Sequence, residues 1–565
     1  MLALLGVLAG CAVVSSEESA STSSEALTDL PLTPGPLVNA EDNFRCNDID
    51  GTFFAKNVSD VQRAVRFAAA TRRSLKVTST RRGAHSGNGI ICPASKGIVI
   101  NVADMQGISL DTSARIVTVG PGVTVDDLSK HLASRGFAIE TMADYTGISV
   151  AGAVATSAHG SSLRIQASMA SLLTSMTLVN GRGNLETLTG STLEVGAAHG
   201  GWLGAVVEIR LRVVPRFKVR YGDEIREDLD LEAQGEKLVR SHDYGRIHWF
   251  PEHGKYVLDF FDRVDVATPG TAYSDAWVQS GTLARVLGDL PSRLVNDSPT
   301  EDIQCTISRV RSSWWIANWQ DAPPGGRAVG FSEAMLGGTC PPGTCAWEGA
   351  SPQKVRSVEV AFPLARFAEW ATDVRGIVEK GHGCFPLLGL YLRFSKGSNL
   401  ALDMAEGADT VLFEIHVLQS LEQNNPEMSS AVYDEIQQLT LGKYAGRPHW
   451  GKNEAPTFLG VGPRAYRKWN DFEALRKNMD PAGLFDNPFR QQAAGTAPPL
   501  VQSAACAPRR ECVCQTDSDC GEGLACSPGL EFPAAKVCRK AAWNSCFRDH
   551  ECATGICSWF MCRKP

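Results

Sequence analysis

The sequence predicts an α+β protein that ends in a small disulfide-rich tail. Apolar residues at helical spacing alternate with β-branched runs through the body, and glycine-rich loops follow several of these runs. Ten of the 17 cysteines crowd between Cys506 and Cys562. The 565 residues are 43% hydrophobic and 21% charged, which excludes wholesale disorder. A net charge of -7 argues against a nucleic-acid-binding protein.

The N-terminus carries an apolar run that ends at Cys11. Leu8–Cys11 resembles the lipobox of bacterial lipoproteins, so residues 1–11 predict a lipoprotein signal with Cys11 as the lipid anchor. We therefore expect an exported protein, membrane-anchored on the periplasmic or cell-surface side. No Lys or Arg precedes the run, which leaves a plain secretory signal or a mis-assigned start as alternatives. Residues 12–42, rich in Ser, Glu and Thr near their start, predict a flexible tether.

The first half of the body shows an alternation of helix and strand patterns. Residues 59–70 have helical periodicity, with Asn57 and Ser59 as candidate N-caps, and we favour Ser59 because it directly precedes the run. Residues 74–80 predict a strand that enters the glycine-rich loop 81–89, whose backbone N–H groups suit phosphate oxygens. The same patterns predict two further strands and a helix at 97–101, 116–119 and 125–136.

The tail, residues 506–565, follows a predicted linker at 491–505. Its cysteines form two four-cysteine modules with similar spacing: Cys514-x5-Cys520-x5-Cys526-x11-Cys538 and Cys546-x5-Cys552-x4-Cys557-x4-Cys562. Together with a Cys506–Cys512 pair they predict a disulfide framework, because so short a segment cannot form a sufficient core. Zinc is the alternative, although no CxxC pair occurs, and the connectivity within each module stays open. In the body, Cys340 and Cys345 predict a short disulfide-closed loop, and Cys92 is interpreted as structural.

Gly120-Pro121-Gly122 is not a dinucleotide-binding fingerprint, because the third glycine and the following acidic residue are missing. The informative feature is an ordered series of segments: Gly83–Ser86, Gly120–Thr124, Ile148–Gly160, Gly201–Ile209, Val213–Pro215, His449–Lys452 and Asp480–Phe485. This series resembles the FAD-dependent aldonolactone oxidase and alditol oxidase group (L-gulonolactone and D-arabinono-1,4-lactone oxidase-like) of the vanillyl-alcohol-oxidase superfamily. The resemblance covers roughly residues 43–490 and leaves out the tether and the tail.

The resemblance implies a fold and an activity. We expect a PCMH-type two-part FAD-binding domain at 43–216, an α+β substrate domain over an antiparallel sheet at 217–440, and a segment at 441–490 that returns to the FAD-binding domain. The implied reaction oxidises a CH–OH group of a sugar-derived lactone or alditol and passes electrons to O2 or another acceptor. A same-fold enzyme for a bulkier alcohol, or a non-catalytic surface scaffold, remain as alternatives. No metal site is predicted.

The resemblance also implies which residues contact FAD. The segment 80–87 would cradle the pyrophosphate, with His85 covalently bonded to the flavin. For Ser149, Thr156, Val206 and Ile209, the alternative to an FAD contact is a purely structural packing role. The full set is Thr80, Arg81, Arg82, Gly83, Ala84, His85, Ser86, Gly120, Ala143, Ser149, Gly152, Ala153, Thr156, His159, Gly160, Gly204, Val206, Ile209 and His449. Ala143 falls where the family has a small residue near the oxygen-accessible face, which leaves oxidase and dehydrogenase open, with oxidase favoured.

Five residues are the candidate catalytic groups. In the resembling family Lys452 lies near the flavin N1 side, where a cation stabilises the reduced flavin, and Arg393 matches a substrate-site arginine. Tyr391 stands where the family usually has a glutamate. Glu414 and His416 alternate onto one face of a strand and form either a site or a satisfied polar pair. We hypothesise that Glu414 takes over the role of the missing glutamate.

Overall fold

The computed structural model describes residues 29–40, 42–80, 84–270, 301–319, 328–337, 354–386, 388–419, 427–497, 504–546 and 548–564. The predicted signal at 1–11, the tether up to residue 28, Arg81, Arg82, Gly83 and the predicted Cys340–Cys345 disulfide lie outside these residues. Within the described ranges, no helix has the length and apolar character needed to cross a membrane.

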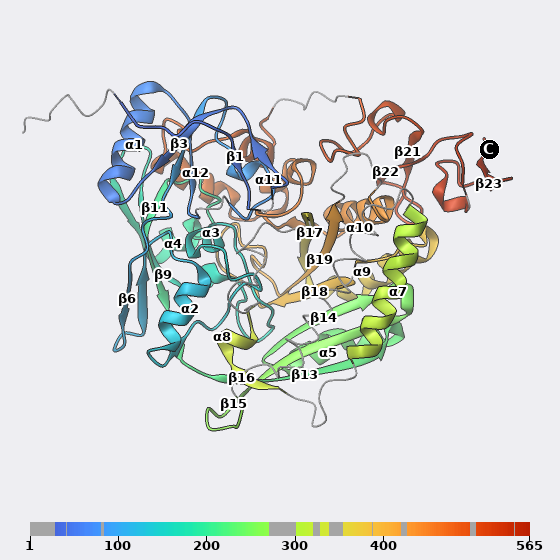
Figure 1. Ribbon diagram of the computed structural model, residues 1–565, viewed down its shortest axis with the longest axis horizontal. Helices are drawn as coiled ribbons and strands as arrows, with labels where there is room; N and C mark the ends of the chain where they lie inside the picture. Colours follow the sequence, from blue (N-terminus) through green and yellow to red (C-terminus); the bar gives the residue numbers. More distant parts are fainter. Residues whose placement is uncertain are drawn as a thin grey trace, which may run out of the picture.

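A small parallel sheet forms the N-terminal part of the body (Figure 1). Its strand order is β3 (Ile49–Phe54), β5 (Gly97–Asn101), β4 (Leu75–Thr78). Helix α1 (Val58–Thr71) packs its apolar face on this sheet. The N-cap of α1 is Asn57, whose side chain accepts from the Asp60 amide, so the prediction of Ser59 is wrong because the helix starts earlier than its apolar periodicity.

The packed body begins before residue 43, where the sequence placed its start. Leu30 is buried in the core of the small sheet, and β1 (Leu37–Val38) pairs with β2 (Arg45–Cys46). These apolar side chains gain enough by burial to order a segment assigned to the tether by its composition. Cys46 forms a disulfide with Cys92, which confirms the structural role predicted for Cys92.

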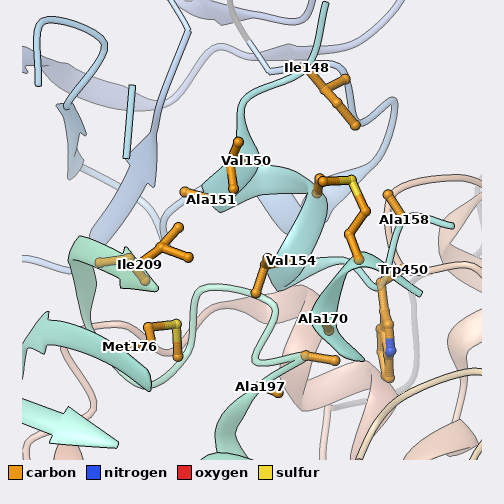
Figure 2. Packing of buried hydrophobic residues seen from close by; sticks show 14 of the residues in the cluster. Ile148, Val150, Ala151, Val154, Ala158, Ala170, Met176, Ala197, Ile209 and Trp450 are labelled. Atoms are coloured by element: carbon orange, nitrogen blue, oxygen red, sulfur yellow. The ribbon is translucent and has the colours of Figure 1, made fainter. Parts of the chain in front are cut away.

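A five-stranded antiparallel sheet forms the second part of the region that the resemblance assigns to FAD, residues 43–216, which is called the FAD-binding half below. Its order is β10 (Leu185–Leu188), β9 (Leu173–Val179), β11 (Ala205–Arg212), β7 (Ile116–Val119) and β6 (Ile108–Asp111). The helices of this part are α2 (Val125–Ala133), α3 (Val150–Ala155) and α4 (Gly190–Gly196). Figure 2 shows Val150, Ala151 and Val154 of α3 beside Met176 and Ile209 of the sheet, all members of one hydrophobic core.

An eight-stranded antiparallel sheet follows, in agreement with the predicted α+β class. Its order is β16 (Val329–Phe331), β13 (Lys218–Glu227), β15 (Lys255–Val264), β14 (Tyr244–Phe250), β18 (Leu390–Ser395), β19 (Thr410–Gln419), β17 (Lys354–Pro363) and β20 (Arg447–Pro448). One face packs on the helices α5 (Leu231–Ser241), α9 (Phe367–Gly381) and α10 (Ser430–Lys443). Because side chains alternate along a strand, the residues between these apolar positions point to the opposite face.

The C-terminal part of the body returns to the FAD-binding half. Helix α12 (Trp469–Met479) contributes Phe472 and Met479 to the same core as α3. Helix α13 (Pro488–Ala493) extends into the predicted linker 491–505, where Gln492 and Ala493 are buried, so the predicted start of the linker lies too early.

The remaining elements of the described residues are short or isolated. They are β8 (Phe137–Ala138), β12 (Val214–Pro215), α7 (Glu301–Trp319), α8 (Ser332–Met335) and α11 (Val461–Ala465), with short 3₁₀ turns at Gly89–Ile91, Met169–Leu172, Asp228–Asp230, Pro251–His253, Leu364–Arg366, Ala455–Phe458, Asp517–Asp519 and Asp549–Glu551. Cys305 of α7 is bonded to Cys384.

The cysteine-rich tail contains disulfides, as predicted, and both modules pair first with third and second with fourth. The bonds are Cys506–Cys512, Cys514–Cys526, Cys520–Cys538, Cys546–Cys557 and Cys552–Cys562. The tail strands are β21 (Leu524–Pro528), β22 (Lys536–Lys540), β23 (Cys557–Ser558) and β24 (Met561–Cys562). The zinc alternative fails because these sulfur atoms are bonded to one another.

The first tail module is docked on α10. Glu435, 1% exposed, accepts the backbone N–H groups of Leu530, Glu531 and Phe532, and Arg539 donates to the same carboxylate. The side chain of Phe532 packs against the core beneath the large sheet. A carboxylate saturated by three amides and a guanidinium fixes the module on the back of that sheet.

Candidate functional site

Four polar side chains form a row across the large sheet. His248 of β14 is directly opposite Tyr391 of β18, Tyr391 is opposite Glu414 of β19, and Glu414 is opposite Glu359 of β17. The pairing confirms that the strands of Tyr391 and Glu414 are neighbours. The apolar residues that alternate with these four along the strands face the helices, so the row lies on the opposite face of the sheet, toward the FAD-binding half. From that half, His159 forms a 2.9 Å hydrogen bond with Glu359.

Glu359 and Glu414 face each other across two strands with almost no exposure, 0% and 2% of their side chains. Like charges in that position repel unless cations neutralise them. Arg393 bridges both carboxylates through one nitrogen, Nη2, at 2.6 Å from each. Lys452 bridges them a second time, with Nζ 2.8 Å from Glu359 Oε2 and a short contact to Glu414 Oε1. The four groups form a charge-balanced cluster.

The electrostatics of the cluster keep both carboxylates ionised. Burial acts to raise the pKa of Glu359, but Arg393, Lys452 and His159 outweigh it and hold the pKa well below its ordinary value. Burial likewise opposes ionisation of Glu414, and His416, Lys452 and Arg393 together lower its pKa to about 2. Glu414 is therefore a fixed anion rather than a proton acceptor at neutral pH.

The loop that carries Lys452 is tied to the backbone of Glu359. The Asn453 side chain accepts from the Glu359 N–H at 2.9 Å and donates to the Glu359 carbonyl at 2.7 Å. The His449 N–H donates to the same carbonyl at 3.0 Å. Asn453 adopts a left-handed backbone (φ 62°), which lets the loop fold back on β17. Position 452 is thus fixed relative to Glu359.

A second tie joins this loop to the loop of His85. The Asn88 amide nitrogen lies 2.8–3.1 Å from the carbonyl oxygens of Trp450, Lys452 and Asn453. The His85 ring stacks on Tyr145 with centroids 4.4 Å apart. Burial and then the Lys452 charge lower the pKa of His85 to about 4, so its imidazole is neutral at physiological pH.

His416, which lies beside the cluster, and Lys452, which belongs to it, are partly exposed. Their side chains are 29% and 20% exposed, whereas Arg393 is 5% exposed. His416 Nε2 lies 3.2 Å from Glu414 Oε1, and because Glu414 is ionised, Nε2 carries the proton. Nδ1 has no hydrogen-bond partner among the described residues, which leaves a lone pair available. Burial lowers the pKa of His416 below its ordinary value.

Tyr391 joins the cluster to the FAD-binding half. Its hydroxyl donates to Asp144 at 2.9 Å, and its ring stacks on His248 at 4.6 Å. Burial raises the pKa of Tyr391 well above its ordinary value, so the phenol stays protonated. Beside it lies a pocket whose lining includes Thr141, Asp144, Ser161 and Arg246.

The predicted cofactor residues fall into two groups. Several lie in the hydrophobic core of the five-stranded sheet or close its turns: Gly120, Ala143, Ala153, Gly204, Val206 and Ile209. The others lie at the end of β4 and in the loop after it, on or beside α3, or next to Glu359: Thr80, Ala84, His85, Ser86, Ser149, Gly152, Thr156, His159, Gly160 and His449. Ser149 caps α3 and lies 2.5 Å from the Ser79 hydroxyl, which joins the end of β4 to the helix.

The inner face of the small sheet fits an elongated polar cofactor. Lys76 and Thr78 alternate away from the α1 core, and both are buried. Thr78 Oγ1 and His199 Nε2 are buried without a hydrogen-bond partner among the described residues. The Gly201 N–H donates to His199 Nδ1, so Nε2 is the protonated nitrogen and needs an acceptor. Such orphaned donors suit a phosphate- and ribose-bearing ligand, and they lie on the same side of the sheet as Lys76, whose pKa burial lowers to about 7.

The sequence-based interpretation did not identify Glu359. The residue lies between Val358 and Val360, as Glu414 lies between Phe413 and Ile415. A lone glutamate inside an apolar strand was a signal that could have found it, because a carboxylate is rarely buried without a partner. Asp144, Tyr145 and Asn453 were missed as well, since their contacts join segments far apart in the sequence.

Comparisons with known families agree with this geometry. Residues 49–189 match the family described as FAD binding domain, and residues 350–493 match the family described as D-arabinono-1,4-lactone oxidase. Residues 503–540 match the family described as L-gulonolactone oxidase 2-like, C-terminal domain. The relationship therefore extends into the first tail module, which corrects the limit at residue 490 drawn from the motifs.

The chain is also similar to individual proteins. It is 26% identical to L-gulonolactone oxidase 5 of Arabidopsis thaliana, over 83% of this chain and 86% of that one. It is 25% identical to an L-gulono-1,4-lactone dehydrogenase of Mycobacterium tuberculosis, over 77% and 94%. A solved cholesterol oxidase from Brevibacterium sterolicum aligns with a TM-score of 0.62 at 15% identity, over 82% and 98%, which shows a shared fold.

We predict that Glu414→Gln destabilises the protein in a pH-dependent manner. A carboxylate whose pKa is lowered on folding contributes stability above its unfolded pKa, and this contribution is lost as pH falls from about 4.5 toward 2. The difference in thermal midpoint between wild type and Glu414→Gln should therefore be largest above pH 5 and shrink on acidification. Glu379→Gln, at an exposed position of α9, is the control. A pH-independent difference would contradict the prediction.

Proposed function

We propose that this chain is a distant member of the FAD-dependent aldonolactone oxidase group and that it oxidises a CH–OH group of a sugar-derived lactone or alditol. The observation that carries the proposal is the free lone pair of His416 beside the fixed anion of Glu414, within a chain that binds FAD. Electrons pass to O2 or another acceptor.

The residues of the site divide the work of oxidation. Converting CH–OH to C=O removes two protons and two electrons, and bound FAD supplies the electron acceptor. His416 Nδ1 takes the hydroxyl proton, while Glu414 holds the ring in the required tautomer and stabilises the imidazolium that forms. Nδ1 is covered in the structure while the His416 side chain is 29% exposed, so the proposal requires that substrate binding opens access to Nδ1.

Lys452 supplies the positive charge at the surface of the site. Its ammonium is held by two buried carboxylates, and its side chain is 20% exposed. A cation fixed in this way stabilises negative charge that develops during the reaction without having to reorganise. Arg393 acts behind it and keeps Glu359 and Glu414 ionised.

The pocket beside Tyr391 has a wall of mixed character, in which Asp144, Ser161 and Arg246 lie beside Met142, Phe261 and Leu336. Asp144 pairs with Arg246 and accepts from Tyr391, and Ser161 donates to the Gly245 carbonyl. The substrate class in this proposal is therefore supported by the family match at residues 350–493 rather than by unpaired groups in the pocket. We also propose that the protein is exported and carries a lipid anchor at its N-terminus. The disulfides of the described residues support export, because disulfides persist in an oxidising compartment.

The proposed function is tested by mixing the purified enzyme anaerobically with aldonolactones, alditols and bulkier alcohols. Bleaching of the flavin absorbance by lactones or alditols is the expected result, and air is then admitted to compare O2 with other acceptors. Bleaching only by bulkier alcohols would overturn the substrate class. A purified protein without flavin absorbance would overturn catalysis by FAD.

We predict that His416→Gln lowers kcat/KM by about 100-fold or more, the usual contribution of a positioned base. The base acts in its neutral form, and the pKa of His416 is lowered, so wild-type activity should persist through pH 6.5 and fall only on further acidification. This acidic limb should disappear in the variant. His131→Gln on α2 should leave the profile unchanged. An unaltered limb in His416→Gln would assign the proton to another group.

We also propose that His85 bonds covalently to FAD. The N–C bond would form with loss of one proton from the imidazole and one proton from the flavin methyl group, and the two electrons released would pass to O2. The neutral state of His85 supports attack by its lone pair. Acid precipitation should leave the flavin in the wild-type pellet and release it into the supernatant from His85→Ala. Release from wild type would contradict the linkage, and His131→Gln serves as control.

A further inference from the structure

The second tail module ends in a hairpin whose tip is made of large aromatic residues. Strands β23 and β24 pair antiparallel, and Trp559 and Phe560 connect them. These side chains are 85% and 71% exposed. The hairpin lies at the C-terminal end of the molecule, away from both parts of the FAD-binding half (Figure 1).

The backbone at the tip is unfavourable for such residues. Trp559 and Phe560 both have left-handed φ values, 57° and 58°. A two-residue hairpin turn of this kind favours Asn-Gly, because most other side chains are strained at a left-handed backbone. Large aromatic side chains that are mostly exposed at such a position indicate an external contact.

Neighbouring residues extend the aromatic tip into a surface. Trp543 is 56% exposed and also has a left-handed backbone (φ 72°). Its backbone N–H donates to the Cys562 carbonyl, and the Cys546 backbone N–H donates to the Phe560 carbonyl. Arg563 lies 5.2 Å from the Trp543 ring, and its Nε donates to the Ser558 carbonyl at 3.3 Å. The guanidinium therefore sits directly behind the tip.

The charges around the tip are predominantly positive. Arg563 and Lys564 follow β24 directly. Among the described residues of the module, Glu551 pairs with Lys540, whereas Asp549 accepts the Cys557 N–H and keeps its charge, so Arg548, Arg563 and Lys564 leave the net charge positive. An aromatic tip backed by basic residues has the chemistry of a membrane-interface contact, in which rings enter the headgroup region and cations meet anionic lipids.

The module is held firmly enough to orient the enzyme. The Lys540–Glu551 pair joins it to β22, and β22 packs on α10. The His550 ring lies 4.7 Å from the His382 ring at the end of α9. A tip fastened to the helices behind the large sheet would fix how the body faces the surface that it contacts.

We propose that Trp543, Trp559, Phe560 and the basic pair Arg563–Lys564 form a docking surface for an anionic lipid bilayer. A glycan platform is the less suitable reading, because the acidic side chains that would bind sugar hydroxyls beside the rings are engaged in the module itself. This contact is independent of Cys11. It provides a second, weaker attachment, and stable association with membranes usually requires two such signals.

The test uses the full chain carrying Cys11→Ser, so that lipidation cannot contribute. Vesicles of phosphatidylcholine alone, or with a quarter phosphatidylglycerol, are sedimented with the protein. Binding should be stronger to the anionic vesicles and should weaken with salt. Trp559→Ser combined with Phe560→Ser should reduce partitioning by about tenfold or more, and Arg563→Gln with Lys564→Gln should remove the preference for anionic vesicles.

The matched control is Leu229→Ser, which removes an 87% exposed apolar side chain from the substrate domain and should change nothing. Thermal midpoint and lactone-dependent bleaching of each variant verify that the fold is retained. Equal binding by the tip variant and wild type would overturn the proposal. Retention on insoluble peptidoglycan without vesicle binding would overturn it in favour of a glycan, and a change only in sedimentation coefficient would assign the tip to self-association.

Discussion

Two carboxylates held directly opposite each other inside a sheet impose the main constraint on this structure. Glu359 and Glu414 are paired across β17 and β19 and are both withdrawn from water. Removing a single ionised carboxylate from water is costly, and two in contact repel, so each requires cations at hydrogen-bond distance. Arg393 comes from the adjacent strand, but Lys452 must be brought by a separate loop. The sheet register and the loop geometry are thus set by the same charge requirement.

That requirement also joins parts of the chain that are distant in sequence. The Lys452 loop is bound to the Glu359 backbone through Asn453 and to the His85 loop through Asn88. His159 reaches the same carboxylate from the FAD-binding half. Consequently the groups expected to meet the flavin are positioned relative to Glu414, the partner of the proposed proton acceptor His416, by buried hydrogen bonds. Positioning by rigid elements, rather than by flexible side chains, is what an oxidation site requires.

The sequence predicted the features that have local causes. The strands 97–101 and 116–119 are found at the expected positions because their apolar runs and flanking turns are local signals. Glu414 and His416 were identified from alternation within one strand. Glu359 was not, because its meaning depends on a cross-strand register that the sequence does not contain. The disulfide connectivity could not be predicted either, because four cysteines allow three pairings in each module.

The tail is connected to the same charge cluster by ion pairs on the opposite face of the sheet. Arg510 pairs with Glu427 and Asp434, Glu427 pairs with Arg356 of β17, and Arg356 reaches Glu454, two residues after Lys452. Burial acts to raise the pKa of Glu427, but Arg356 and Arg510 together lower it to about 2. This chain of ion pairs begins in a disulfide-bonded segment and ends on both elements that position Glu359 and Lys452. Buried ion pairs of this kind contribute little net stability, but they penalise any arrangement that separates them. The tail is therefore part of the framework that positions the cluster, and the segment involved lies within the family match at residues 503–540.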